Sequence, residues 1–229
     1  MEFTKLSNRL NLVASFVPAG ARLLDVGSDH AYLPIALLQE GKIEAAIAGE
    51  VVEGPYQSAL QNVADNGLED KIEVRLANGL AAFEPTDGIS CITIAGMGGR
   101  LIADILAAGL EKLASVSRLV LQPNNREDEL RGWLVDHDFR IVDEAILEEN
   151  EKFYEILVVE QGSQDLTATE LRFGPYLMRE QAPAFVQKWS KEVEKLAFAL
   201  EQVPVENQSA RASLEERIAQ IKEVLHVSK

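Results

Sequence analysis

The sequence predicts an α/β fold followed by a helical arm, and three observations support this. Short apolar runs alternate with amphipathic helical stretches between residues 22 and 136, which is typical of β–α units and a parallel sheet. Two strand-like runs, Phe139–Leu147 and Phe153–Val159, then follow each other with no helix between them. Beyond residue 165 only helical periodicity remains. We therefore expect a mostly parallel sheet with an antiparallel hairpin at one edge and two antiparallel helices after it.

Composition limits the classes of protein to consider. The chain has 229 residues, 47% of them hydrophobic, and a formal net charge of -15, so we expect one domain of ordinary size or one domain with an appendage. Such acidity argues against sequence-blind nucleic-acid binding, which depends on Lys and Arg, but leaves room for a local basic patch. The single cysteine, Cys91, lies in an apolar run, and His30, His137 and His226 lack metal-ligand spacing. No signal peptide or membrane-length apolar run is evident, so we expect a cytoplasmic protein that binds neither metal nor membrane.

The helical pattern at residues 4–17 comes first in the chain. Its apolar positions recur at spacings of four, three and four, while Lys5 and Arg9 lie off that stripe. Two interpretations stay open. The helix packs on the sheet and nothing more, or Lys5 and Arg9 begin a phosphate-contacting patch.

The first strand and its turn are the centre of the pattern. Leu23, Leu24 and Val26 form an apolar run, Gly27 permits a sharp turn, and Pro34 suits the first turn of a helix. The turn is not a dinucleotide-binding fingerprint, because it has one glycine flanked by Asp25 and Asp29. Two carboxylates suit a ligand with a cationic amine and hydroxyl groups, such as S-adenosylmethionine. The alternative is a β–α turn with solvated acidic side chains.

The next two strands also end in polar residues. Glu50 follows the apolar run Ala45–Gly49, 23 residues after Gly27, where an acidic side chain can accept hydrogen bonds from ribose hydroxyls. A helix is expected from Pro55 to Asn66 and a strand from Ile72 to Leu76. Asn78-Gly79 then offers an amide that can bind an adenine edge, or it is a simple turn.

The clearest strand is Ile89–Ala95, which runs into Gly96-Met-Gly-Gly-Arg100. Its glycines allow the backbone to approach a ligand, but no Lys-Ser/Thr follows as in a P-loop. A helix is expected over Leu101–Leu113, a strand over Leu119–Leu121 and a helix over Glu127–Asp136. Between the last two stands Gln122-Pro-Asn-Asn125, where Asn124 either reads a base edge or belongs to a capped turn.

The polar segment 161–165 marks the expected domain boundary, with one domain over residues 1–162 and a helical arm over residues 163–229. Apolar residues then recur at alternating spacings of three and four from Trp189 to Val203 and from Leu214 to Leu225. These stripes predict an antiparallel, coiled-coil-like helical hairpin. Such an arm is either structural or dimerising, or it holds part of a large substrate.

Three motifs together resemble one family. Asp25–Pro34, Ala95–Gly99 and Gln122–Asn124 are similar to the bacterial tRNA (adenine-22-N1)-methyltransferases, and the resemblance covers essentially the whole chain. It implies a Rossmann-like class I methyltransferase domain with a coiled-coil-like tail. It also implies methyl transfer from S-adenosylmethionine to N1 of an adenine in tRNA.

The resemblance also implies site residues. Asp25, Gly27 and Asp29 would lie beside the methionine part of the cofactor, Glu50 at the ribose, and Asn78 and Gly79 at the adenine. The cofactor set further includes Ser28, His30, Val51, Gly96, Met97 and Gly98. Asp29 and Asn124 are the candidate catalytic residues. The candidate tRNA contacts are Lys5, Arg9, Arg100, Arg126 and Arg131.

Two other functional classes stay open from the residues alone. The acidic composition also suits a methyltransferase that acts on a small molecule or a protein. A module that binds S-adenosylmethionine without transferring its methyl group is the second class. Methyl incorporation into tRNA separates both from the main interpretation, and the oligomeric state, monomer or weak dimer, is left open.

Overall fold

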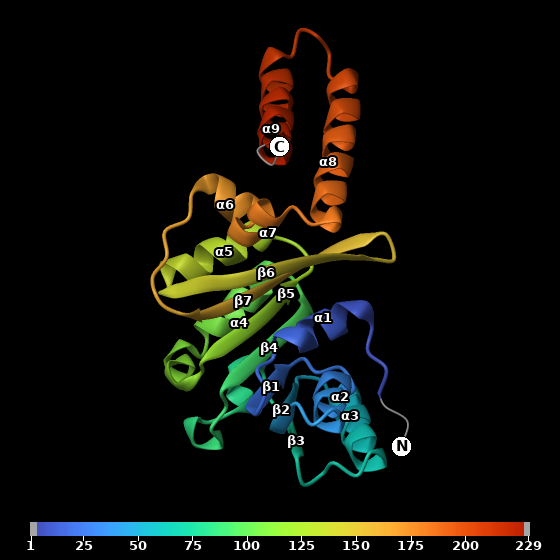
Figure 1. Ribbon diagram of the computed structural model, residues 1–229, viewed down its shortest axis with the longest axis vertical. Helices are drawn as coiled ribbons and strands as arrows, with labels where there is room; N and C mark the ends of the chain where they lie inside the picture. Colours follow the sequence, from blue (N-terminus) through green and yellow to red (C-terminus); the bar gives the residue numbers. More distant parts are fainter. Residues whose placement is uncertain (1–3, 227–229) are drawn as a thin grey trace.

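A computed structural model describes residues 4–226, which form a seven-stranded sheet with helices on both faces and a helical arm (Figure 1). The strand order is β3-β2-β1-β4-β5-β7-β6. The first five strands in the chain are parallel, and the last two are antiparallel to their neighbours. The strands are β1 (Ala21–Val26), β2 (Ile43–Glu50), β3 (Ile72–Leu76), β4 (Cys91–Met97), β5 (Arg118–Pro123), β6 (Phe139–Glu149) and β7 (Lys152–Gln161).

The strand order reverses between β1 and β4. The chain proceeds outward from β1 to β3, returns to the other side of β1 with β4, and then proceeds outward again. Loops at the carboxyl ends of the two central strands therefore diverge and leave a crevice between them. Open α/β sheets bind ligands at such a switch point.

Two apolar layers cover the sheet, because successive side chains of a strand point to opposite faces. Leu23 packs with the helices of one face and Leu24 with those of the other. The first face carries α1 (Asn8–Phe16), α2 (Tyr32–Gln39) and α3 (Glu53–Asp65). The second carries α4 (Gly99–Ala107), α5 (Glu127–Asp136) and the 3₁₀ turns η1 (Gly79–Ala82) and η3 (Leu110–Ser115). A further 3₁₀ turn, η2 (Pro85–Asp87), has no buried residue.

The expected edge hairpin is confirmed. Glu149 pairs with Lys152, so Asn150 and Glu151 form a two-residue turn, and both have positive φ (52° and 64°). Two left-handed residues are what a type I′ hairpin turn requires. The second strand of the hairpin, β7, pairs with β5, which leaves β6 at the edge.

The C-terminal segment forms four helices, namely α6 (Ala168–Phe173), α7 (Pro175–Glu180), α8 (Pro183–Gln202) and α9 (Gln208–His226). Helices α8 and α9 lie antiparallel, side by side, and extend away from the sheet (Figure 1). Their apolar stripes meet around Trp189, Leu196 and Ile221. The predicted helical hairpin is thus confirmed, but the short helices α6 and α7, which join it to the sheet, were not predicted.

Two helices differ from their expected bounds by more than two residues at one end. The helix expected over Leu101–Leu113 ends at Ala107, and η3 follows after Gly109, whose φ of -137° is not helical. The first helix begins at Asn8 rather than residue 4, because the Ser7 hydroxyl accepts a hydrogen bond from the N–H of Leu10 and caps it. Among residues 4–226, none of the helices combines the length and apolar composition that a membrane span needs.

Candidate functional site

Nearly all residues of the turn after β1 have a positive φ, in the left-handed region of backbone conformation. Gly27 has a φ of 67°, and Asp29, His30 and Ala31 have φ values of 42°, 69° and 59°. Non-glycine residues adopt this conformation at a cost, and such strain concentrates at functional sites. The turn aims backbone N–H groups at the end of β2: those of Gly27 and Ser28 donate to the Gly49 carbonyl at 2.9 and 3.3 Å.

Asp25 is a buried acid at the end of β1. Its two carboxylate oxygens accept hydrogen bonds of 2.6 Å from the hydroxyls of Ser28 and Thr93. Burial raises the pKa of Asp25, while these two hydroxyls act in the opposite direction. The carboxylate is therefore held in a set orientation at the edge of a cavity.

That cavity has a volume of about 270 Å³ and lies where β1 and β4 diverge. Glycine at position 27 is required chiefly by its positive φ of 67°, because the atom that an added Cβ would crowd is Cε at the flexible end of Met97. The lining residues are Arg9, Leu10, Asp25, Gly27, Ser28, Asp29, Tyr32, Leu33, Ala95, Gly96 and Met97.

Glu50 is the second buried acid, at the end of β2. Its Oε1 accepts the N–H of Asp29 at 2.5 Å, so one side-chain oxygen orders the β1 turn. Burial raises the pKa of Glu50, the Asp29 N–H lowers it, and the nearby charges of Asp25 and Asp29 raise it further. Its other oxygen, Oε2, accepts no hydrogen bond from the residues that the structure describes. Val51, the next residue, is 59% exposed.

A second cavity, of about 360 Å³, lies between η1 and α4. Asn78 and Gly79 line one wall, and Leu101, Asp104 and Ile105 line the other. A Cβ at Gly79 would lie 2.9 Å from Cγ2 of Ile105, so glycine allows η1 and α4 to pack this closely. The predicted adenine residues therefore line a cavity of their own.

Amides join the loops after β4 and β5. Buried Gln122 accepts, through Oε1, the N–H of Gly96 at 3.0 Å and Nη1 of Arg9 at 2.6 Å. Asn124 donates from Nδ2 to the Gly96 carbonyl at 2.7 Å and accepts from Nε2 of Gln122 at 3.1 Å. The candidate catalytic amide is thus fixed beside Gly96 and Met97.

The structure brings most predicted site residues to one edge of the sheet. Gly98 packs beside Asn125, and His30 lies next to Asp29 with Nε2 at 3.4 Å from its carboxylate. Thr93 and Gln122 were missed as site residues. Each is a polar residue in a buried strand, which normally needs a partner, and that signal could have identified them.

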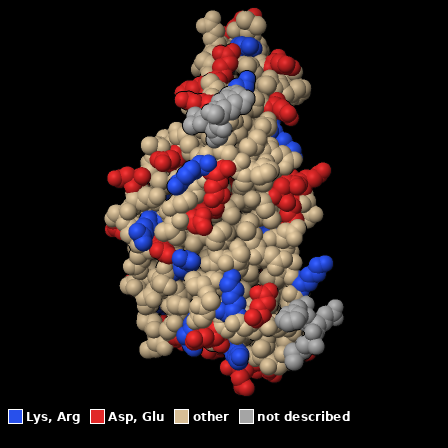
Figure 2. Space-filling view, viewed as in Figure 1, with Lys and Arg blue, Asp and Glu red and all other residues tan. Residues whose placement is uncertain are grey.

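The predicted basic contacts do not form one patch. Arg9 lines the first cavity and lies 5.6 Å from the ring centroid of Tyr154, and Arg126 pairs with Glu129 at 2.9 Å. Lys5 and Arg100 are exposed. On the face shown in Figure 2, basic and acidic side chains are interspersed.

The prediction that Arg131 contacts tRNA is wrong. Its side chain has 0% exposure and forms ion pairs with Glu144 at 2.7 Å and Glu155 at 2.5 Å. A guanidinium that two buried carboxylates enclose cannot reach a phosphate at the surface. Cys91, by contrast, is buried as expected, and burial raises the pKa of its thiol to about 12.

These features fit the chemistry of S-adenosylmethionine. One buried acid stands at the end of β1, another with an available oxygen stands at the end of β2, and glycine backbone lines the space between β1 and β4. Within residues 4–226 no group of three or more His, Cys, Asp or Glu side chains is arranged to hold a metal ion. The parallel sheet with its antiparallel edge hairpin and this site define a class I S-adenosylmethionine-dependent methyltransferase.

Comparison with known proteins specifies the family. The family model described as tRNA (adenine(22)-N(1))-methyltransferase matches residues 23–223. The tRNA (adenine(22)-N(1))-methyltransferase of Bacillus subtilis (strain 168) is 40% identical over 236 residues, which cover 98% of this chain and 99% of that protein. This chain therefore belongs to the tRNA (adenine(22)-N(1))-methyltransferase family. The fold class, the enzyme class and the methyl donor predicted from the sequence are confirmed.

Solved structures agree over nearly the whole chain. A Streptococcus pneumoniae protein in complex with S-adenosyl-L-methionine has 66% identity and a TM-score of 0.90, with coverage of 97% of this chain and 100% of that chain. The M. capricolum TrmK in complex with S-adenosyl-homocysteine has 29% identity and a TM-score of 0.84, with coverage of 98% and 99%. The helical arm is therefore part of the shared fold.

Proposed function

We propose that this protein transfers the methyl group of S-adenosylmethionine to N1 of the adenine at position 22 of tRNA, in the cytoplasm. The observation that carries the proposal is the contact between two sites. Gly96 lines the cavity beside Asp25, and its carbonyl accepts a hydrogen bond from Asn124. A methyl donor beside Asp25 and a base beside Asn124 would therefore meet at Gly96 and Met97.

The cofactor is proposed to lie across the carboxyl ends of β1, β2 and β4. Asp25 and the β1 turn would hold the methionine part, because a carboxylate suits its amino group. Oε2 of Glu50 would accept from the ribose hydroxyls, while Asn78 and Gly79 would receive the adenine in the second cavity. Glu50 would thus hold the cofactor and the β1 turn together.

Adenine N1 carries an in-plane lone pair and would attack the methyl carbon directly, so that the N–C bond forms as the S–C bond breaks and S-adenosylhomocysteine leaves. S-adenosylmethionine supplies this electrophilic methyl group when it is bound, so the protein mainly has to orient the two reactants. Asn124 keeps one N–H and one oxygen lone pair beyond its hydrogen bonds to Gly96 and Gln122, and the lone pair would accept from adenine N6. That contact leaves N1 directed toward the cavity.

The methylated base is cationic, so a carboxylate nearby would stabilise the charge that develops in the transition state. Asp29 stands at the cavity with its side chain 83% exposed, where a base that enters from solvent would reach it. We assign it this electrostatic role. The base would leave the tRNA stack to reach this position.

We also propose that residues 1–162 form the catalytic domain and residues 163–229 form the arm. Strand β7 ends at Gln161, and the helices after Gly162 build a further apolar cluster around Phe173 and Trp189, which Ile146 of β6 joins from the sheet. The arm would hold part of the tRNA outside the catalytic domain.

The decisive experiment is methyl transfer from labelled S-adenosylmethionine to total bacterial tRNA, followed by nuclease digestion and mass spectrometry. We expect N1-methyladenine. A tRNA transcript with guanine in place of adenine 22 is the control and should accept no methyl group. Clear calorimetric binding of S-adenosylmethionine without incorporation into tRNA would assign the protein to a different substrate class.

A further inference from the structure

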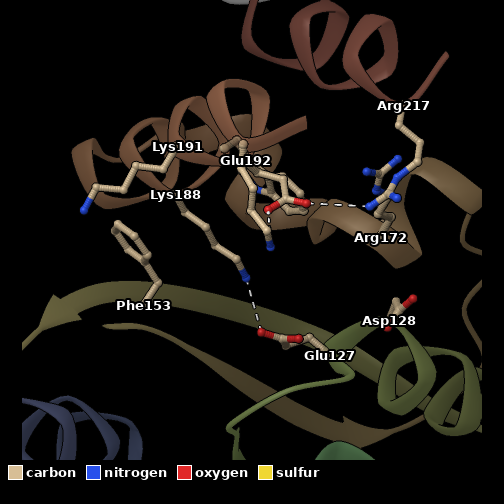
Figure 3. A pocket seen from close by; sticks show the side chains of 10 residues that line it. Glu127, Asp128, Phe153, Arg172, Lys188, Lys191, Glu192 and Arg217 are labelled. Carbon is tan, nitrogen blue, oxygen red and sulfur yellow. Dashed lines mark hydrogen bonds and ion pairs between the residues drawn. The ribbon is translucent and has the colours of Figure 1, made fainter. Parts of the chain in front are cut away.

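A third cavity, of about 440 Å³, lies where the arm joins the sheet (Figure 3). It is larger than either cavity of the candidate methyl-transfer site. Residues from α5, the start of β7, α6, α8 and α9 line it. Five of its lining side chains are Lys or Arg and three are Asp or Glu, so the cavity has a positive balance within a chain whose net charge is -15.

Several of these charges are already paired. Lys188 donates to Glu155 at 2.6 Å and to Glu127 at 3.2 Å. Glu192 pairs with Arg217 at 3.6 Å and with Lys195 at 3.5 Å. Among the residues that the structure describes, no carboxylate lies within 4 Å of Arg172 or Lys191. Arg172 and Lys191 are therefore the two lining cations that form no ion pair within the described part of the chain.

Arg172 is held in place without an acid. Its Nη1 donates to Oε1 of Gln220 at 2.7 Å, and its guanidinium carbon lies 4.9 and 5.7 Å from the ring centroids of Phe173 and Trp189. Partial burial, and then the charge of Arg217, lower the pKa of Arg172, while the nearby charges of Glu192 and Asp128 act in the opposite direction. A partly desolvated cation beside another cation is unfavourable, and a bound anion would offset both costs.

Trp189 forms part of the wall of the cavity. Its side chain lines the cavity and is 8% exposed, yet its indole Nε1 has no hydrogen-bond partner. It is the single buried side-chain nitrogen or oxygen within the described part of the chain that lacks one. That nitrogen is inaccessible to solvent, so Trp189 contributes its ring to the wall of the cavity and not a hydrogen-bond donor.

The cavity is adjacent to the proposed methyl-transfer site. Glu127 and Asp128, which line it, follow Asn124 by three and four residues. On the hairpin, Phe153 lines the cavity, while the next residue, Tyr154, faces the opposite way and contacts Arg9. One hairpin thus separates the two sites.

We propose that this cavity binds backbone phosphates of the tRNA substrate. The proposal rests on the proposed function, because tRNA is the polyanion that this enzyme has to hold. Arg172 and Lys191, which lie toward opposite ends of the cavity in Figure 3, would each contact a phosphate of their own. Half or more of protein–nucleic acid hydrogen bonds go to phosphate and sugar, and they position the chain rather than read its sequence.

The test measures affinity for an unmodified tRNA transcript that carries adenine 22, by fluorescence anisotropy at several salt concentrations. The full-length variants are Arg172→Gln, Lys191→Gln and the double variant. We expect each single variant to lose about tenfold in affinity. Each should also reduce the slope of log affinity against log salt by about one. The matched control is Lys71→Gln, an exposed lysine beside β3 at the opposite edge of the sheet, which should behave as wild type.

Equal affinities and slopes for the double variant and Lys71→Gln would overturn the inference. Lys191 is exposed, so Lys191→Gln keeps the test valid even if Arg172→Gln folds poorly. A wild-type protein that binds tRNA but forms no N1-methyladenine would overturn the proposed function instead. A wild-type protein that methylates tRNA while its double variant binds tRNA normally would overturn only this inference.

Discussion

Nη2 of Arg131 lies 2.5 Å from Oε2 of Glu155, and both side chains are almost completely buried. Arg131 also donates to Oε1 of Glu144 at 2.8 Å and to the Leu171 carbonyl at 3.1 Å, while Lys188 donates to Oε1 of Glu155 at 2.6 Å. This network joins α5 and the edge hairpin to α6 and α8. Burial alone would raise the pKa of Glu155, but the charges of Arg131 and Lys188 lower it.

Arg131→Met should therefore be strongly destabilising. It leaves two buried carboxylates without their main partner, and we expect a loss of about 3–5 kcal/mol in the free energy of unfolding. Urea denaturation measures this loss. The matched control is Arg118→Met, which breaks the more exposed 2.6 Å pair with Glu160 and should cost about 1 kcal/mol or less. Equal losses in the two variants would contradict the role of the buried network.

Asp25→Asn should change how stability depends on pH. Because burial raises the pKa of Asp25 above its ordinary value of 3.8, the wild-type carboxyl takes up a proton more readily when folded than when unfolded. Its contribution to stability is then complete below pH 3.8 and is lost as pH rises through the raised pKa. The stability of Asp25→Asn relative to wild type should therefore increase from about pH 4 upward and then level off. This prediction would be refuted if urea titrations from pH 4 to 8 showed a constant difference in unfolding free energy between Asp25→Asn and wild type.

Glu50→Gln should weaken cofactor binding. A neutral amide makes weaker hydrogen bonds to ribose hydroxyls than a carboxylate, so we expect about a tenfold loss of S-adenosylmethionine affinity by calorimetry. Glu53→Gln, an exposed acid three residues further on at the start of α3, is the control. If the two variants bind S-adenosylmethionine equally well, Glu50 is not the ribose ligand.

Asp29→Asn should lower turnover and spare cofactor affinity. Asparagine tolerates the left-handed conformation that Asp29 adopts, with a φ of 42°, so this variant removes the charge without straining the turn. We expect kcat for tRNA methylation to fall roughly tenfold or more. Unchanged kcat, with folding and cofactor affinity intact, would exclude the electrostatic role.

Gly99→Ala should disturb the loop that carries Asn124. An added Cβ would lie 2.4 Å from the carbonyl oxygen of Arg126 and 2.9 Å from that of Asn125, so backbone has to move. We expect thermal unfolding at lower temperature and reduced turnover. Gly132→Ala is the control, because nothing lies within 4 Å of its added Cβ and alanine favours a helix by about 1 kcal/mol. Lower stability in both variants would point to a general intolerance of these helices to substitution.

Much of the fold follows from local patterns. Apolar runs predicted the strands because parallel strands are buried on both faces, and the absence of a helix between Leu147 and Phe153 predicted the hairpin. The positions of Asp25, Glu50 and Asn124 after strands predicted one shared site, since the carboxyl ends of parallel strands meet at one edge. Which hairpin strand lies outermost is not a local property, and the pairing of β7 with β5 decided it.

The sequence by itself determined the order of the strands and of the helices between them, the two-helix arm and the edge of the sheet that carries Asp25, Glu50 and Asn124, because each depends on spacing along the chain. Only the tertiary structure decided which charged side chains are buried in ion pairs and which line a cavity. The sequence pattern predicts a helix around Arg131 but does not show which partners this residue has. Those partners, Glu144 and Glu155, are 13 and 24 residues away. The cavity around Arg172 and Lys191 likewise combines residues from five elements. Pairing between distant charges depends on how helices and strands pack, and periodicity along the chain carries no information about it.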